Sequence, residues 1–347
     1  MADLANRFSE NPILRPVDIE PSRSDMVVEC LLNPGAFKLD GYTWLLVRVA
    51  ERPKQAEGKM SFPVLRNGKM EILSFNLDDP LLDPSDPREP IYDGETYLST
   101  LSHLRLFKSR DGLHFEDAHL PHLVGEGDLE SYGIEDCRVA TMEDGEYLLS
   151  YTATSSSGYG VGLMRTRNWS DYERCGMMLP PANKDCAIFE SKVNDDYICF
   201  HRPSGVGLGG HYIWLSSSKD LMHWGRHACV AKTRVGMWDS ARIGAGAAPI
   251  ETEKGLLAIY HGADEAKRYC LGALLLDPND PSRIIARSDE PLMEPVEDYE
   301  KEGFFGNVVF TNGHTVVGDD ITLYYGASDT VICGARLSID EVLATLL

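Results

Sequence analysis

Charged side chains recur at matching places in a pattern that repeats along the chain. Each repeat opens with polar residues at the start of a short apolar run: Asn33, Glu135 with Asp136 and Arg138, Lys184 with Asp185, Asp239 with Arg242, and Asn307. The second apolar run of several repeats ends in Arg48, in His201 with Arg202, in His261, or in Tyr325 with Asp329 just beyond. Cations gathered in a chain of net charge −21 favour a specific anion site for phosphate or carboxylate. Ion pairs between repeats would place the same residues in the same way.

Asp136 is the candidate for acid catalysis. It follows Glu135 and stands two residues before Arg138, at the opening of an apolar run. A proton donor for cleavage of a glycosidic bond needs a carboxyl group in a partly desolvated pocket, which such a position would supply. A turn cap or a structural partner of Arg138 fits the same position, so the residues alone leave both interpretations open.

Pairs of short strands would position these side chains. Segments starting at Gly133, Asn183, Ser240 and Phe304 share an apolar run, a turn and a second apolar run, and an earlier copy starts at Leu31. The turns EDGE, NDD, ETEKG, GDD and LDG have the Gly, Asp and Asn residues of hairpins. Most copies add a third apolar run, and several add a polar turn and a fourth. The pattern predicts five units of about four antiparallel strands.

Units of about four antiparallel strands that repeat along a chain are typical of β-propeller blades. We therefore predict an all-β, five-bladed β-propeller, a single domain over residues 1–347 with short helical termini such as the tail SIDEVLATLL. Residues 51–97, rich in Pro and Asp, would be an insertion that serves as a lid or a subunit contact. The alternative is a β-sandwich, which rarely repeats the same polar opening. Because first strands line the channel of a propeller, the polar openings would converge on one pocket.

Composition excludes several classes of partner. The chain has 33 Lys and Arg against 54 Asp and Glu, which argues against binding to nucleic acid or to an anionic membrane. No run reaches the roughly 18–20 apolar residues of a membrane span, and MADLANRFSENP does not resemble a signal peptide. The eight cysteines are scattered without a CxxC pair, which predicts reduced thiols and no zinc site. We expect a cytoplasmic protein that binds no metal.

Three other features are weaker candidates. His223 and His227 are four residues apart but lie in a predicted turn without the Glu of a metalloprotease helix. The glycine-rich run 205–210 opens no helix, so it does not predict a dinucleotide site and is better explained as a loop near a ligand. Trp238 is either a platform for a sugar ring or, as we favour, a core residue.

The ordered motifs GIEDCR, NKDCAIFESK, HRPS, DSARIGAG, IYHGA, EPVEDYEKEGFFGNVVF and YGASDT resemble those of glycoside hydrolase family 130, the five-bladed mannoside phosphorylases. The resemblance runs from Glu10 to the C-terminus and is greatest to the β-1,2-mannobiose and β-1,2-oligomannan phosphorylases. It implies a glycosyltransferase-type enzyme that cleaves β-1,2-mannosides with inorganic phosphate and inversion, giving α-mannose 1-phosphate. Asp136 would be the general acid, acting through the 3-hydroxyl of the mannosyl unit. Phosphate replaces the attacking water, so no second catalytic carboxylate is required.

The resemblance also implies roles for individual residues. The phosphate ligands would be Lys184, Arg202, Arg242, His261 and Tyr269, with phosphate as a co-substrate and no cofactor. The mannosyl unit would be held by Asn33, Arg48 and Asp329, and repeat position adds Glu135, Arg138, Asp239 and Asn307 as candidate substrate-binding residues. The sequence departs from the family pattern at Lys184, where some members have Arg, at Cys137, and in FESK in place of FPEK.

Alternatives remain at this stage. A β-1,4-mannoside phosphorylase or a β-mannoside hydrolase would have the same fold, although hydrolytic members replace cationic phosphate ligands and this chain keeps Arg242 and His261. A non-catalytic glycan-binding propeller would be expected to lack Asp136. A transferase using an activated mannose donor is a fourth hypothesis. The residues leave chain length and oligomeric state, a homo-oligomer included, undetermined.

Overall fold

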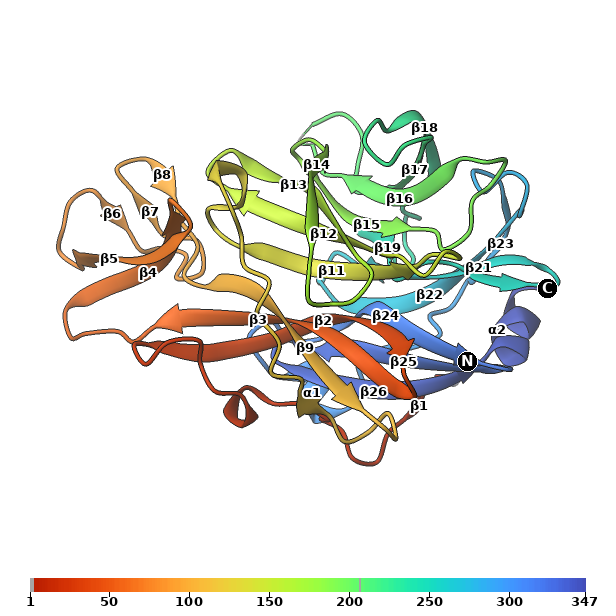
Figure 1. The fold of residues 1–347 in the computed structure, drawn as a ribbon, viewed down its shortest axis with the longest axis horizontal. Helices are drawn as coiled ribbons and strands as arrows, with labels where there is room; N and C mark the ends of the chain where they lie inside the picture. Colours follow the sequence, from red (N-terminus) through yellow and green to blue (C-terminus); the bar gives the residue numbers. More distant parts are fainter. Residues whose placement is uncertain (1–2, 206) are drawn as a thin grey trace.

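Antiparallel sheets make up most of the molecule in the computed structural model, which describes residues 3–205 and 207–347 (Figure 1). The first sheet has the order β10-β9-β3-β2, and the second and third follow the chain as β11 to β14 and β15 to β18. The fourth is β19-β21-β22-β23 with β20 beside β21, and the fifth is β1-β26-β25-β24. The all-β prediction is confirmed.

The strands of the first sheet are β2 (Met26–Leu39), β3 (Tyr42–Pro53), β9 (Leu101–Ser109) and β10 (Glu116–Asp117). The second and third sheets consist of β11 (Ile134–Thr141), β12 (Tyr147–Ser155), β13 (Gly158–Thr166), β14 (Glu173–Leu179), β15 (Asn183–Ile188), β16 (Tyr197–Pro203), β17 (Ile213–Ser218) and β18 (Gly225–Ala231). The fourth and fifth consist of β19 (Arg242–Ala245), β20 (Ile250–Thr252), β21 (Gly255–Ala263), β22 (Tyr269–Leu276), β23 (Ile284–Arg287), β24 (Val309–Val317), β25 (Asp320–Ala327), β26 (Val331–Ser338) and β1 (Asn6–Arg7).

Local sequence explains the hairpins. Asp40 and Gly41 join β2 to β3 with φ of 51° and 77°, so both central residues of the turn are left-handed. That is the backbone of a type I′ turn, whose twist matches that of paired strands and which Asp-Gly favours. The predicted helical tail is α2 (Ile339–Leu346), and the hydroxyl of Ser338 caps it by accepting a hydrogen bond from the backbone N–H of Glu341. Short helical turns occur at Pro16–Asp18, Asp128–Glu130 and Asp298–Lys301 (α1).

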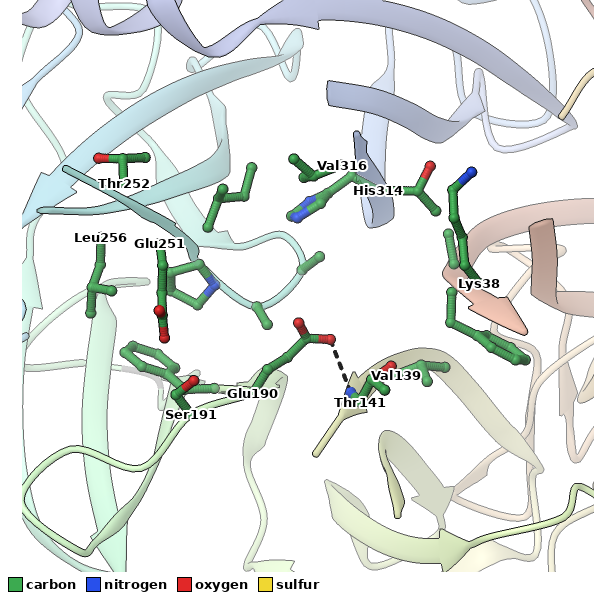
Figure 2. Close-up of a pocket in the computed structure, with 18 of the residues that line it drawn as sticks. Lys38, Val139, Thr141, Glu190, Ser191, Glu251, Thr252, Leu256, His314 and Val316 are labelled. Atoms are coloured by element: carbon green, nitrogen blue, oxygen red, sulfur yellow. Dashed lines mark hydrogen bonds between the residues drawn. The ribbon is translucent and has the colours of Figure 1, made fainter. Parts of the chain in front are cut away.

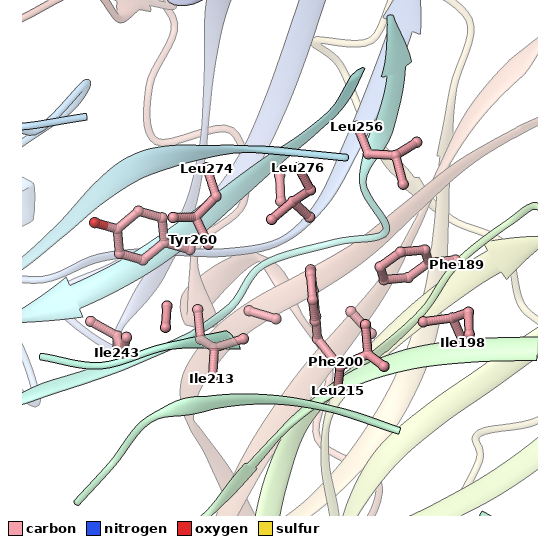
Figure 3. Packing of buried hydrophobic residues seen from close by; sticks show 14 of the residues in the cluster. Phe189, Ile198, Phe200, Ile213, Leu215, Ile243, Leu256, Tyr260, Leu274 and Leu276 are labelled. Atoms are coloured by element: carbon pink, nitrogen blue, oxygen red, sulfur yellow. The ribbon is translucent and has the colours of Figure 1, made fainter. Parts of the chain in front are cut away.

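A hydrophobic cluster lies between each sheet and the next. The cluster between the third and fourth sheets contains Phe189, Phe200, Tyr260 and Leu274, all less than 5% exposed (Figure 3). Similar clusters join the second to the third, the first to the second, and the fourth to the fifth sheet. A further cluster joins the fifth sheet back to the first. Each large side chain buried in this way contributes roughly 1.5–3 kcal/mol, so the five sheets hold one another in place.

Residues 51–97 leave the first sheet and return to it. They include the end of β3, a hairpin of β4 (Lys59–Arg66) and β5 (Lys69–Asn76), and a small sheet of β6 (Leu82–Asp83), β7 (Ile91–Tyr92) and β8 (Glu95–Thr96), seen at the left of Figure 1. Phe62 stacks on Tyr97 with ring centres 4.7 Å apart, and Tyr97 in turn packs on Tyr132. The insertion is therefore packed beside the residues that lead into β11.

Among the residues that the structure describes, none of the helices is long and apolar enough to cross a membrane. All eight cysteines are free thiols.

Candidate functional site

Three strands carry the same irregularity at the same place. The pairing register shifts between Leu32 and Gly35 in β2, between Glu135 and Arg138 in β11, and between Lys184 and Ala187 in β15. The residues inside these bulges include Asn33, Asp136 and Asp185, with φ of 40°, 49° and 53°. Asn and Asp tolerate this left-handed conformation better than most residues. A bulge re-aims a side chain, and all three of these line one cavity.

That cavity has a volume of about 230 Å³ and lies near the starts of β11, β15 and β19. It is lined by Leu32, Asn33, Arg48, Asp136, Lys184, Asp185, Arg202, Arg242, Tyr269, Phe305, Val308, Phe310 and Asp329. Eight of these are residues that the sequence predicted: Asp136 as the acid, and seven others as ligands of the substrate or phosphate. The lining therefore combines four cations and three carboxyl groups in a small space, which suits an anion and a hydroxylated ligand together.

Asp136 is buried and held by two neighbours. Asn33 Nδ2 and Arg48 Nη1 each donate to Asp136 Oδ1 over 3.1 Å, and Arg48 also pairs with Glu135 at 2.9 Å. Burial by itself would raise the pKa of Asp136, but the charges of Arg48, Lys184 and Arg138 lower it below its usual value. Asp136 is therefore ionised when the cavity holds no other anion.

The pKa of Asp329 is shifted in the opposite direction. Burial raises the pKa of Asp329 to about 6, against the attraction of Arg48, and the nearby charge of Asp136 adds to the rise. Two carboxyl groups in one cavity thus have pKa values pushed apart, a pattern found in acid–base sites.

The cations at the other side of the cavity come from the third and fourth sheets. Arg242 Nη1 donates to the Tyr269 hydroxyl over 3.1 Å, and Arg202 Nη1 lies 3.0 Å from Asp185 Oδ2. Lys184 Nζ lies 5.3 Å from the centre of the Tyr159 ring. These are four of the five residues predicted for phosphate: Lys184, Arg202, Arg242 and Tyr269.

His261, the fifth, lies behind the cavity wall. It is fully buried, its Nε2 is 3.2 Å from Asp185 Oδ2, and its ring packs on Phe310 at 4.1 Å between centres. Burial lowers the pKa of His261 to about 4, so the ring is neutral at pH 7. In this structure His261 contacts the cavity residues Asp185 and Phe310 rather than lining the cavity itself.

Three further predicted substrate-binding residues are also placed elsewhere. Arg138 is 2% exposed and donates hydrogen bonds to the backbone carbonyls of Asp136, Ala245 and Gly246. Its buried side chain therefore links β11 to the end of β19. Asp239 is fully buried and accepts from its ion-pair partners Arg234 and Arg287 and from Tyr260. Asn307 has an exposed side chain and acts through its backbone carbonyl, which accepts from the Tyr269 N–H over 2.9 Å.

Glu135 lines a second, larger cavity of about 830 Å³ that continues from the first. The two share Arg48 and Lys184 in their walls. The second is also lined by residues of the insertion and by hydroxyl-bearing side chains of the second sheet, namely Arg88, Glu89, Glu95, Thr96, Thr152, Thr154, Ser155, Ser156 and Tyr159. The insertion therefore forms part of the cavity wall.

A third cavity, of about 620 Å³, lies at the other ends of the same strands (Figure 2). Its lining includes Val139 and Thr141 at the end of β11 and Val316 at the end of β24. Glu190 accepts a hydrogen bond from the Thr141 N–H over 2.9 Å, and burial raises the pKa of its carboxyl group. The predicted residues that line a cavity gather in the first two instead.

Asp185 is the site residue that the sequence left without a role. It was visible in the repeat pattern beside Lys184, and its match to Asn33 and Asp136 was the signal that could have identified it. The aromatic residues Phe305 and Phe310 in the wall gave no such signal. The weaker candidates fall outside the site: His223 pairs with Asp220 on the surface, and Trp238 is a core residue. In the part of the chain that the structure describes, no cluster of His, Cys, Asp and Glu has the composition of a metal site.

Known proteins resemble this chain in sequence and in fold. A model of the glycoside hydrolase 130 family, described as β-1,4-mannooligosaccharide phosphorylase, matches residues 92–346. The chain is 40% identical over 347 residues to the β-1,2-mannobiose phosphorylase of Listeria innocua serovar 6a, covering 98% of each chain. It is 39% identical to a 1,2-β-oligomannan phosphorylase of Thermoanaerobacter sp. strain X514, covering 71% of this chain and 82% of the relative. The Listeria innocua enzyme in complex with β-1,2-mannobiose superposes with a TM-score of 0.94 at 39% identity, over 99% of both chains.

Proposed function

The chain belongs to glycoside hydrolase family 130, and from that membership we propose that it catalyses inverting phosphorolysis of β-1,2-mannobiose or short β-1,2-oligomannans. The products are α-mannose 1-phosphate and either mannose, from β-1,2-mannobiose, or an oligomannan one unit shorter, and the reaction is reversible. The observation that carries the proposal is the cavity that Arg48, Lys184, Arg202 and Arg242 line together with Asp136. One carboxylic acid and a cation cluster are what an inverting phosphorolysis requires, because phosphate replaces water as the nucleophile.

The five sheets act as five blades of a β-propeller in this proposal. The hydrophobic clusters that join consecutive sheets, and the cluster that joins the fifth to the first, support a ring. The pairing of β1 with β26 supports it further, since the N-terminal strand completes the sheet of the C-terminal ones. A ring brings the bulges of β2, β11 and β15 to one mouth of the central channel.

Asp136 supplies the proton to the departing sugar, through the 3-hydroxyl of the mannosyl unit. In the free site its neighbours Arg48, Lys184 and Arg138 hold its pKa low. A phosphate dianion between Lys184, Arg202 and Arg242 neutralises part of that positive charge, so the pKa of Asp136 rises when phosphate binds. The acid is thereby protonated in the complex that contains the nucleophile, and the cations hold phosphate for attack on the anomeric carbon.

The two connected cavities hold different parts of the substrate. The cavity of about 230 Å³ holds the mannosyl unit and phosphate, with Asn33, Arg48 and Asp329 on the sugar. The larger cavity beside Glu135 holds the sugar that leaves, and its many hydroxyl and carboxylate groups suit hydrogen bonding to a polyhydroxylated ligand. A cytoplasmic location fits eight free thiols.

The deciding experiment is incubation with β-1,2-mannobiose, with and without inorganic phosphate, and an assay for mannose 1-phosphate by anomer. Phosphate-dependent formation of the α-anomer is expected. Release of mannose at the same rate without phosphate would identify a hydrolase. Since the family model is described as a β-1,4-mannooligosaccharide phosphorylase, β-1,4-mannobiose is the matched substrate control, and preference for it would reassign the linkage.

A further inference from the structure

Asp185 is a buried carboxylate in contact with two arginines and a histidine. Its side chain is fully buried at the cavity wall, with Oδ1 3.3 Å from Arg138 Nη2 and Oδ2 3.0 Å from Arg202 Nη1. The same Oδ2 lies 3.2 Å from His261 Nε2. Burial by itself would raise the pKa of Asp185, but Arg202, His261 and Arg138 lower it well below its usual range, so the group is ionised. A carboxylate at this place repels phosphate, so its presence needs an explanation.

The backbone of Asp185 has the same strained conformation as that of Asp136. It has a φ of 53° inside the bulge of β15, as Asp136 has a φ of 49° inside the bulge of β11. Left-handed backbone at a residue other than glycine costs of order 1 kcal/mol or more and is concentrated at functional sites. Both residues also contact Arg138, through the carbonyl of Asp136 and the carboxylate of Asp185. Asp136 faces Asn33 and Arg48, whereas Asp185 faces Arg202 and His261.

We propose that Asp185 is a positioning residue of the phosphate site, which holds the Arg202 guanidinium and the His261 ring in the geometry that receives phosphate. The inference depends on the proposed phosphorolysis and assigns Asp185 no contact with the reacting atoms. Arg202 is 6% exposed, and a buried guanidinium without a carboxylate partner is both costly and free to turn away.

The close packing around this carboxylate supports the assignment. A Cβ atom on Gly244 of β19 would collide with Asp185 Oδ2 and with the imidazole of His261. Glycine at that position therefore leaves room for the contact between the carboxylate and the ring. His261 in turn packs on Phe310, which lines the cavity. A shift of Asp185 would be transmitted to both Arg202 and the wall.

The test compares Asp185→Asn with Glu51→Gln in the full chain. Glu51 is an equally buried carboxylate, 1% exposed and 3.2 Å from the buried Arg105, in the first sheet away from the cavity. Initial rates are measured against phosphate at saturating β-1,2-mannobiose and against β-1,2-mannobiose at saturating phosphate, with a melting curve for each variant. Asp185→Asn is expected to lower kcat/KM for phosphate by about 10- to 100-fold while KM for β-1,2-mannobiose changes less than threefold. Glu51→Gln is expected to change neither kinetic parameter.

Two results would overturn the inference. A lower KM for phosphate in Asp185→Asn would mean that the carboxylate acts only by repulsion, and equal losses for both substrates would mean a structural role alone. If Asp185→Asn does not fold, Asp185→Glu keeps the charge but displaces it by one methylene group, and the same selective loss is expected. A wild-type enzyme without phosphorolysis would refute the proposed function instead, so the two failures are separable.

Discussion

Asn33 Nδ2 donates a hydrogen bond of 3.1 Å to Asp136 Oδ1, joining two left-handed bulge residues that are 103 positions apart in the chain. One belongs to the first sheet and the other to the second. Because both backbones are fixed by strand pairing on either side of the bulge, the amide holds the carboxylate in one orientation. The orientation of the proposed acid therefore depends on how the first and second sheets pack against each other.

Replacing Asp136 with Asn should remove the proposed proton donor and leave the backbone unchanged, since Asn also tolerates left-handed φ. We expect phosphorolysis to fall by about 10²–10⁴-fold, the usual contribution of a general acid. Binding of β-1,2-mannobiose, measured by calorimetry, should change little. A variant with wild-type turnover would exclude Asp136 as the acid.

Replacing Arg242 with Ala should weaken phosphate selectively. Arg242 lines the cavity and is oriented by the Tyr269 hydroxyl, so its loss removes one charge-assisted contact worth roughly 1.5–3 kcal/mol. KM for phosphate should therefore rise by at least tenfold, while KM for β-1,2-mannobiose stays within a few fold. Arg283→Ala, which removes an arginine with an exposed side chain paired with Asp277, is the matched control and should behave as wild type. An Arg242→Ala enzyme that is indifferent to phosphate concentration would contradict the assignment.

Asp329 should give the enzyme an ionisation near pH 6. With its pKa at about 6, the group changes charge in that range, and kcat/KM for the mannoside should show a corresponding inflection that Asp329→Asn lacks.

The raised pKa of Asp329 also has an effect of defined sign on the stability of the fold. A carboxyl whose folded pKa is raised from 3.8 to about 6 destabilises the fold once both states are ionised, by at most about 3 kcal/mol.

The Asp329→Asn variant should consequently melt at a higher temperature than wild type at pH 7.5, in the absence of ligands. The difference should shrink as the pH falls from 6 to 4, where the wild-type carboxyl becomes protonated in the folded state. Thermal melts at four or five pH values measure this, and a gain that does not depend on pH would show that Asp329 has no raised pKa.

Gly244→Ala should damage the site through a single methyl group. The added Cβ would collide with the Asp185 carboxylate and the His261 ring, both fully buried, so the side of the cavity that we propose for phosphate must shift. We expect a drop of at least tenfold in kcat/KM for phosphate. Gly225→Ala at the start of β18 adds the same methyl group with no atom within 4 Å, so it should retain activity and stability. Equal activity of the two variants would mean that the residues around Asp185 accommodate the added methyl group without a loss of activity.

Much of the architecture could be predicted from the sequence, because the strands and turns of each repeat depend on residues that are close together in the chain. Hairpin turns such as Asp40-Gly41 and the alternation of polar openings with apolar runs depend on neighbours only a few residues away. The terminal helix is also specified by nearby residues, since Ser338, directly before its first residue, caps it. For the same reason the polar openings at Asn33, at Asp136 and at Lys184 with Asp185 could be identified as equivalent places in the repeats, and the structure places these residues in one cavity.

What the residues could not decide was which charged groups serve the cavity and which serve the core. Asp239 and Arg138 occupy openings like the others, yet Asp239 pairs with Arg287, 48 positions away, and Arg138 bonds to carbonyls of the fourth sheet. Asp185 gained its importance only from Arg202 and His261, which other strands bring to it. The strands, the repeats and the family could be predicted from the sequence, because these follow from local patterns. The tertiary structure alone decided the partners of each buried charge, because ion pairing depends on distances across the packed sheets that no spacing along the chain records.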